Sequence, residues 1–114
     1  MTKIYHNPRC SKSRQTLELL QSKGIEPEVI EYLKTPPSAA ELDEVLKKLH
    51  LEPQDITRSK EKTYEELDLK EKKLSRQEMI QVLVKNPILI ERPIVVQGAK
   101  AAIGRPPEKV LEIL

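Results

Sequence analysis

The chain has 114 residues, of which 33% are charged, and its 20 basic and 18 acidic residues leave a net charge of +2. This length fits one domain, and so small a charge does not indicate a nucleic-acid-binding protein. No apolar run approaches the roughly 20 residues of a membrane span, and the start lacks the apolar core of a signal peptide. We therefore expect no membrane association and a cytoplasmic location. The single cysteine, Cys10, excludes an internal disulfide and a Cys-x-x-Cys zinc site, so no metal site is expected.

The first third of the chain predicts a strand, a helix and a second strand. Residues 2–6 form the first predicted strand, residues 11–23 a helix that Gly24 ends, and residues 28–32 the second strand. A strand–helix–strand unit of about 30 residues predicts two parallel strands.

The middle of the chain predicts two helices that begin with capping boxes. One begins after Ser38 and runs to about Leu49, and the other begins after Ser75 and ends at Asn86-Pro87. The charge-rich residues 58–73 between them predict a solvated linker with a helical turn.

The last 30 residues predict two further strands and a terminal helix. Residues 94–96 are wholly apolar and β-branched, which predicts an interior strand, and a turn at Gly98 leads to a further strand at 101–103. Pro106-Pro107 then opens a terminal helix, whose inward-facing residues are predicted to be Val110, Leu111 and Leu114. The order is that of an α/β, thioredoxin-like fold (βαβ … ββα). We expect a single domain, 1–114, with a helical insertion at about 37–86 between the second and third strands.

The candidate reactive residue, Cys10, lies in the loop between the first predicted strand and the first predicted helix. Pro8 biases Asn7 away from helix, so Cys10 is expected at or just before the first helical turn. Unpaired backbone N–H groups and the helix dipole at that position stabilise a thiolate and attract an anion. The loop therefore predicts a nucleophilic cysteine beside an oxyanion pocket. The alternative is a structural, buried cysteine, against which the polar and basic neighbours argue.

Four side chains add potential positive charge around this cysteine: His6, Arg9, Lys12 and Arg14. His6 either supports the thiolate, by a hydrogen bond or by charge, or caps the first strand as a polar residue. Spacing alone does not decide between the two roles.

The motif His-Asn-Pro-x-Cys-x-x-Ser-Arg, here residues 6–14, resembles the active-site loop of the glutaredoxin-linked arsenate reductases. This is the ArsC family, and the chain looks close to its chromosomally encoded branch. The resemblance covers essentially the whole chain. It implies Cys10 as the catalytic nucleophile, His6 as its partner, and a substrate-binding set of Arg58, Arg92 and Arg105.

The resemblance also implies a cis peptide bond before Pro93, which would carry Arg92 beside Cys10. Guanidinium groups suit a doubly charged oxyanion because their planar forks give bidentate bonds and stay protonated. Without the family, Arg92 could instead pair with an acid such as Glu91. Arg105 could equally be a rim residue before the terminal helix, and Arg58 could be a surface cation.

The implied function is the reduction of arsenate to arsenite by a monomer with no bound cofactor. Glutathione is the implied co-substrate and glutaredoxin the implied protein partner. The lone cysteine fits this independently, because the second thiol of any redox cycle must come from outside. The best-characterised resistance enzymes carry Gly-Thr after the cysteine, whereas this chain has Ser11-Lys12, which leaves both arsenate and a related oxyanion open as the substrate.

Two other functions fit parts of the pattern. Related thioredoxin-like regulators bind RNA polymerase, but they usually carry Cys-x-x-Cys, and this chain has Ser13 at the second position. A glutathione-dependent oxidoreductase acting on mixed disulfides would need the reactive Cys10 but not three arginines.

Overall fold

The computed structural model describes residues 1–114, which divide into two compact units. The first comprises Met1–Thr35 and Arg92–Leu114, and the second comprises Pro36–Glu91. Each is described by itself below. No helix in either unit is long and apolar enough to cross a membrane.

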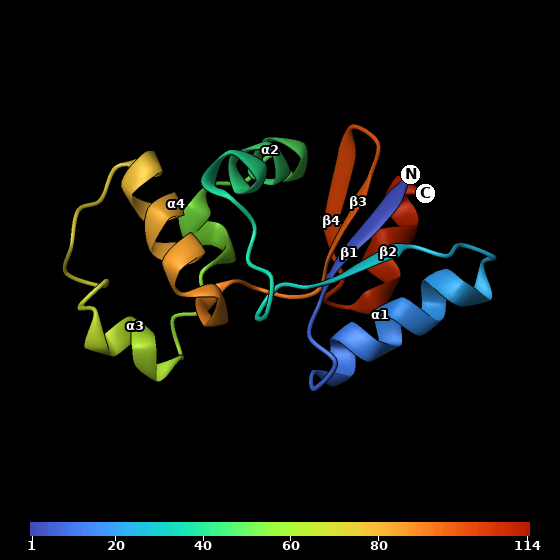
Figure 1. Ribbon diagram of the computed structural model, residues 1–114, viewed down its shortest axis with the longest axis horizontal. Coiled ribbons are helices and arrows are strands. Elements are labelled where there is room, and N and C mark those ends of the chain that lie inside the picture. The colour runs from blue at the N-terminus through green and yellow to red at the C-terminus, as the bar shows by residue number, and fades with distance from the viewer. The chain divides into compact units, whose positions relative to one another are not determined.

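The first unit contains a four-stranded mixed sheet, visible in Figure 1. Its strands are β1 (Thr2–His6), β2 (Glu28–Glu31), β3 (Ile94–Gln97) and β4 (Lys100–Ile103), and their spatial order is β2-β1-β3-β4. Strand β1 runs parallel to β2 and antiparallel to β3, and β3 and β4 form an antiparallel hairpin. The predicted parallel pair, the hairpin and the interior position of residues 94–96 are therefore confirmed.

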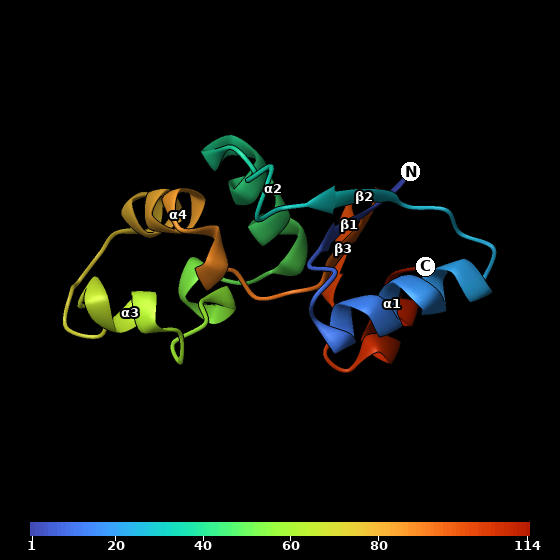
Figure 2. The same cartoon turned by 60° about the horizontal axis from the view of Figure 1, so that its bottom comes forward.

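Helix α1 (Ser11–Ser22) and the terminal 3₁₀ helix η3 (Pro107–Ile113) cover one face of this sheet, as Figure 2 shows. The core beneath them is aliphatic, and its centre is fully buried. Its central residues are Ile4, Leu20, Val95 and Val110. Helix α1 ends as predicted before Gly24, whose φ of +78° lies in the left-handed region.

The prediction for the end of the chain is wrong in one respect. Val110 is buried, but Leu111 and Leu114 are 38% and 44% exposed. The segment is a 3₁₀ helix, so side chains three residues apart share a face. Val110 therefore shares its inward face with Pro107 and Ile113, and Leu111 and Leu114 lie together on a different, exposed face.

The second unit contains the helices of the predicted insertion. They are α2 (Ala39–Leu49), η1 (Pro53–Ile56), α3 (Lys62–Glu66), α4 (Arg76–Lys85) and η2 (Pro87–Leu89). The Ser38 side chain accepts a hydrogen bond from the Glu41 backbone N–H, and Ser75 forms a reciprocal capping box with Glu78. Both predicted helix starts are confirmed, and so is the helical turn within the charged segment.

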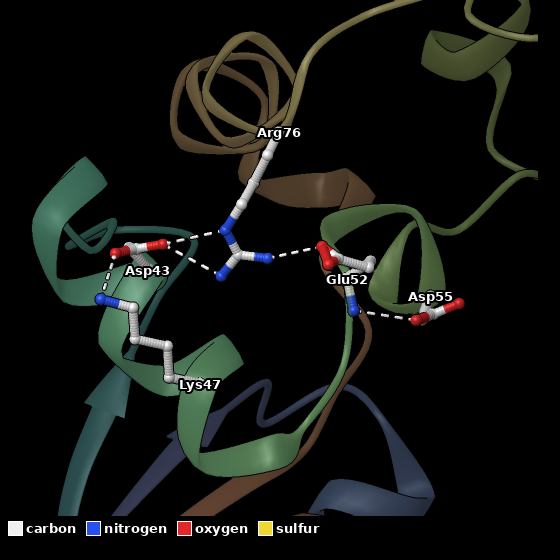
Figure 3. Close-up of polar contacts among 5 residues, drawn as sticks. All are labelled: Asp43, Lys47, Glu52, Asp55 and Arg76. Atoms are coloured by element: carbon white, nitrogen blue, oxygen red, sulfur yellow. Dashed lines mark hydrogen bonds and ion pairs between the residues drawn. The ribbon is translucent and has the colours of Figure 1, made fainter.

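An ion-pair network joins three helical segments of the second unit (Figure 3). The Arg76 guanidinium on α4 donates from Nε and Nη2 to one carboxylate oxygen of Asp43 on α2, at 3.2 and 3.0 Å. Its Nη1 lies 2.6 Å from Glu52 before η1. Lys47 pairs with the other oxygen of Asp43 at 3.2 Å. Hydrogen bonds from Arg76 and Lys47 hold the pKa of Asp43 below its usual value.

Candidate active site

The loop that precedes α1 places Cys10 at the helix N-cap, as predicted. Cys10 has extended backbone angles (φ −96°, ψ 123°), and its carbonyl accepts the Arg14 N–H at 3.0 Å. The turn is closed by Asn7, whose carbonyl accepts the Cys10 N–H and whose side chain accepts the Arg9 N–H, each at 3.0 Å. The Arg14 guanidinium donates to the Pro8 carbonyl at 2.9 Å. The backbone therefore sets the position of the sulfur.

The surroundings of the sulfur lower the pKa of the Cys10 thiol. Burial is the largest single influence, and it acts in the opposite direction by disfavouring the charged form. The backbone N–H of Ser13, the charge and hydrogen bond of Arg92, and the backbone N–H of Lys12 together outweigh it. The helix start and one guanidinium thus stabilise the thiolate.

Cys10 is more buried than its polar and basic neighbours in the sequence predict. The residue is only 9% exposed. The expectation is wrong because it rested on Arg9, Lys12 and Arg14, whose side chains are exposed, whereas the groups at the sulfur are backbone N–H groups and the distant Arg92 and Arg105. The sulfur is nevertheless lined by N–H groups and guanidinium rather than sealed among apolar side chains.

The ends of two strands bring Arg92 and Arg105 to the cysteine. Arg92 lies two residues before the start of β3, and the Arg92–Pro93 peptide bond is cis, as expected. Arg105 follows β4, and its Nη1 lies 4.0 Å from the Cys10 sulfur and 3.4 Å from the Arg92 carbonyl oxygen. Two guanidinium groups and a thiolate therefore gather at one helix N-terminus, an arrangement suited to an oxyanion and to nucleophilic attack on it.

His6 ends β1 and is only 6% exposed. Its Nδ1 lies 2.6 Å from the Ser13 hydroxyl, which also accepts the Asn7 N–H at 3.0 Å. Burial, partly countered by the charge of Glu31 and reinforced by that of Arg14, lowers the pKa of His6. The imidazole is therefore neutral near pH 7 and accepts a hydrogen bond from the Ser13 hydroxyl at Nδ1. The positive charge expected of His6 is not present at that pH.

Arg58 belongs to the second unit, where it is partly buried among acidic groups. Its Nη1 lies 2.9 Å from Glu61, and its Nε lies 4.0 Å from Glu91. Its backbone N–H donates to the Leu89 carbonyl at 2.7 Å. Arg58 is thus an ion-paired residue within its own unit.

Sequence reasoning missed three residues that support the loop: Ser13, Thr16 and Gly104. All three are buried, and Ser13 and Thr16 have no exposed surface at all. Ser13 stands where a dithiol loop has its second cysteine and is the serine of the motif in residues 6–14, and these two signals could have found it. Thr16 and Gly104 carry no signal in the sequence, because their importance comes from a close contact between distant segments. No cluster of three or more His, Cys, Asp or Glu side chains could hold a metal ion.

Comparisons with known proteins identify the family of the chain. The ArsC family model matches residues 5–113. An arsenate reductase of Haemophilus influenzae is 49% identical over 112 residues, which cover 97% of this chain and 97% of that protein. A protein of Escherichia coli K12 named uncharacterized protein YfgD is 57% identical over 98% of this chain and 95% of its own length. The solved structure of an arsenate reductase from Vibrio cholerae has a TM-score of 0.96 at 51% identity and covers 99% of this chain and 97% of that one.

The fold and the cysteine loop define a thioredoxin-like α/β protein whose single free thiol lies at the start of a helix. The chain belongs to the ArsC family. The resemblance first suggested by the loop motif is confirmed.

Proposed function

We propose that this protein is an arsenate reductase that reduces arsenate to arsenite through Cys10. The observation that carries the proposal is the position of the Cys10 sulfur at the start of α1, 4.0 Å from a guanidinium nitrogen of Arg105 and hydrogen-bonded by Arg92. The names of relatives such as the Haemophilus influenzae arsenate reductase support the same substrate class.

Arg92 and Arg105 are the proposed substrate-binding residues closest to the reaction. Arsenate carries about two negative charges near neutral pH, so a site that binds it must supply more than backbone N–H groups. Guanidinium forks supply charge and bidentate geometry together. Arg58 is the third proposed substrate-binding residue, and its ion pairs with Glu61 and Glu91 would have to yield to the oxyanion.

The proposed reaction begins with attack of the Cys10 thiolate on arsenic, and one oxygen leaves as water after taking up protons. Glutathione displaces a second oxygen, again as water. The thiolate of glutaredoxin then attacks the glutathione sulfur, so that a disulfide forms and the arsenic–sulfur bond to glutathione breaks. The electron pair of that bond reduces As(V) to As(III). Water finally cleaves the bond between Cys10 and arsenic, which releases arsenite and returns the thiol.

An external thiol is needed because the chain has no second cysteine. The scheme uses two, and the family resemblance implies glutathione as the co-substrate and glutaredoxin as the protein partner, with no bound cofactor. The requirement places the proposed reaction in a reducing compartment, the cytoplasm.

His6 is proposed as a positioning residue rather than a source of charge. Its Nδ1 holds the Ser13 hydroxyl at 2.6 Å, and the Ser13 backbone N–H is one of the groups that stabilise the Cys10 thiolate. The neutral imidazole would thus act on the sulfur through the backbone of the loop.

The test is arsenite production from arsenate with glutathione and glutaredoxin, each thiol omitted in turn. We expect turnover only with both thiols, and none from Cys10→Ser. Arg105→Ala is expected to raise the KM for arsenate, whereas Arg9→Ala, which removes an exposed charge from the same loop, is expected to have a small effect. Turnover by the Cys10→Ser variant would contradict the nucleophile. Full activity on mixed disulfides, with no arsenite formed, would favour the oxidoreductase alternative.

A further inference from the structure

Three chain segments that carry the proposed site meet at Gly104, the residue before Arg105. The Gly104 N–H donates to the Pro93 carbonyl at 2.9 Å, which joins the end of β4 to the turn that follows Arg92. Its carbonyl lies 3.5 Å from the Thr16 hydroxyl on α1, the helix that begins at Cys10. The segments bearing the thiol and both nearby guanidinium groups are thus in contact through one buried residue.

The contact is too close for any side chain at position 104. A Cβ on Gly104 would lie 2.5 Å from Thr16 Oγ1, 3.1 Å from Thr16 Cγ2 and 2.9 Å from Cγ of Pro93. Ordinary van der Waals contacts of a Cβ are 3.4–4 Å. The absence of a side chain is therefore required by this close approach, and the backbone angle of Gly104 does not lie in the left-handed region.

Neither neighbour can move aside easily. Thr16 has no exposed surface, and both branches of its side chain face Gly104. Its hydroxyl also donates to the Lys12 carbonyl at 2.8 Å, in the first turn of α1. Pro93 is a buried ring. A side chain at position 104 would therefore displace the β4 end and the residue that follows it.

We propose that Gly104, seated against Thr16 and Pro93, is a positioning residue that sets the distance between the Arg105 guanidinium and the Cys10 sulfur. The inference rests on the proposed function, because it assigns the placement of an oxyanion-binding group. Arg105 reaches the sulfur at 4.0 Å and the Arg92 carbonyl at 3.4 Å, both long contacts that a small shift of its backbone breaks.

The size of the effect follows from the overlap. Restoring an ordinary contact from 2.5 Å requires a displacement of about 1 Å, and a misplacement of that size can cost about 100-fold in rate. We expect Gly104→Ala to lower kcat/KM for arsenate by roughly 10- to 100-fold, mostly through KM, because the affected group binds the substrate.

The experiment measures oxyanion binding separately from turnover. Sulfate or arsenate in the oxyanion pocket should slow alkylation of Cys10, and the half-protecting concentration reports the affinity. Gly104→Ala should raise that concentration about as much as it raises KM. If wild-type protein shows protection but no arsenate reduction, the proposed function fails while the positioning inference stays testable.

Gly98→Ala is the matched control. Gly98 lies in the turn of the same β3–β4 hairpin with a φ of +59° and nothing within 4 Å of its would-be Cβ. The same substitution there strains the backbone without touching the site. Thermal unfolding of both variants then separates hairpin stability from placement of Arg105.

A double variant tests the contact itself. Thr16→Ala removes two of the three close atoms, so Gly104→Ala/Thr16→Ala should recover part of the affinity that Gly104→Ala loses. Three results would overturn the inference. The first is a folded Gly104→Ala variant that oxyanions protect from alkylation as well as they protect wild type, and the second is an equal loss of oxyanion affinity in Gly98→Ala. The third is a double variant that binds oxyanion no better than Gly104→Ala does, once the effect of Thr16→Ala alone is subtracted. Weaker oxyanion binding in Gly104→Ala but not in Gly98→Ala, with part of the affinity recovered in the double variant, would support it.

Discussion

Replacing Arg92 with alanine tests how the thiolate is stabilised. The Nε and Nη1 atoms of Arg92 are buried, so the charge acts on Cys10 in a poorly hydrated environment. A hydrogen bond to a charged group contributes about 1.5–3 kcal/mol, and about 1.4 kcal/mol is a factor of ten in an equilibrium. Arg92→Ala should therefore lower the thiolate population roughly 10- to 100-fold at a pH where the thiol is mostly protonated in both proteins.

The reactivity should fall less than the population. A thiolate of higher pKa is a better nucleophile, with a Brønsted coefficient of about 0.4–0.5, so the alkylation rate at low pH should drop only about 3- to 10-fold. The Ser13 and Lys12 backbone N–H groups remain in the variant and continue to lower the pKa of Cys10.

The assay combines the ultraviolet absorbance of the thiolate with the pH dependence of alkylation. Arg92→Lys is the matched control, because it retains the charge but loses the planar fork, and it should fall between wild type and Arg92→Ala. If the Arg92→Ala titration superimposes on that of wild type, the helix start alone stabilises the thiolate and the role given to Arg92 is wrong.

Three further predictions concern other parts of the chain. Asp43→Asn should lower the midpoint of thermal unfolding near neutral pH. Because the pKa of Asp43 is lowered in the fold, its contribution is present above the ordinary carboxyl pKa and is lost as pH falls through the lowered value, so the difference from wild type should shrink in acid. Ser13→Ala should raise the pKa of His6, observed by NMR, because the hydroxyl that donates to the neutral ring is removed; an unchanged titration would argue against that hydrogen bond. Glu61→Gln should lower the KM for arsenate by about fivefold, the upper end of the range for an ion pair in contact with solvent, and should have no effect in an Arg58→Ala background if Arg58 binds the substrate.

Local chemistry made much of the fold predictable. Ser38 and Ser75 mark helix starts because their side chains accept the backbone N–H groups that a helix leaves unpaired. Gly24 and Gly98 mark a helix end and a turn because both residues have positive φ. The terminal helix and its buried Val110 were predictable, but Leu111 and Leu114 were not, because their exposure follows from a three-residue period that the sequence does not distinguish from a 3.6-residue one.

The sequence by itself determined that a lone thiol would lie at a helix start among basic residues, because Pro8, Cys10 and the helix that follows are neighbours in the chain. Only the tertiary structure decided which cations reach the sulfur. Arg92 and Arg105 do so because antiparallel β3 and β4 bring their ends to the start of α1, and because Gly104 leaves room for Thr16. Contacts between residues distant in the chain depend on strand register and on close packing, and neither can be read from local spacing.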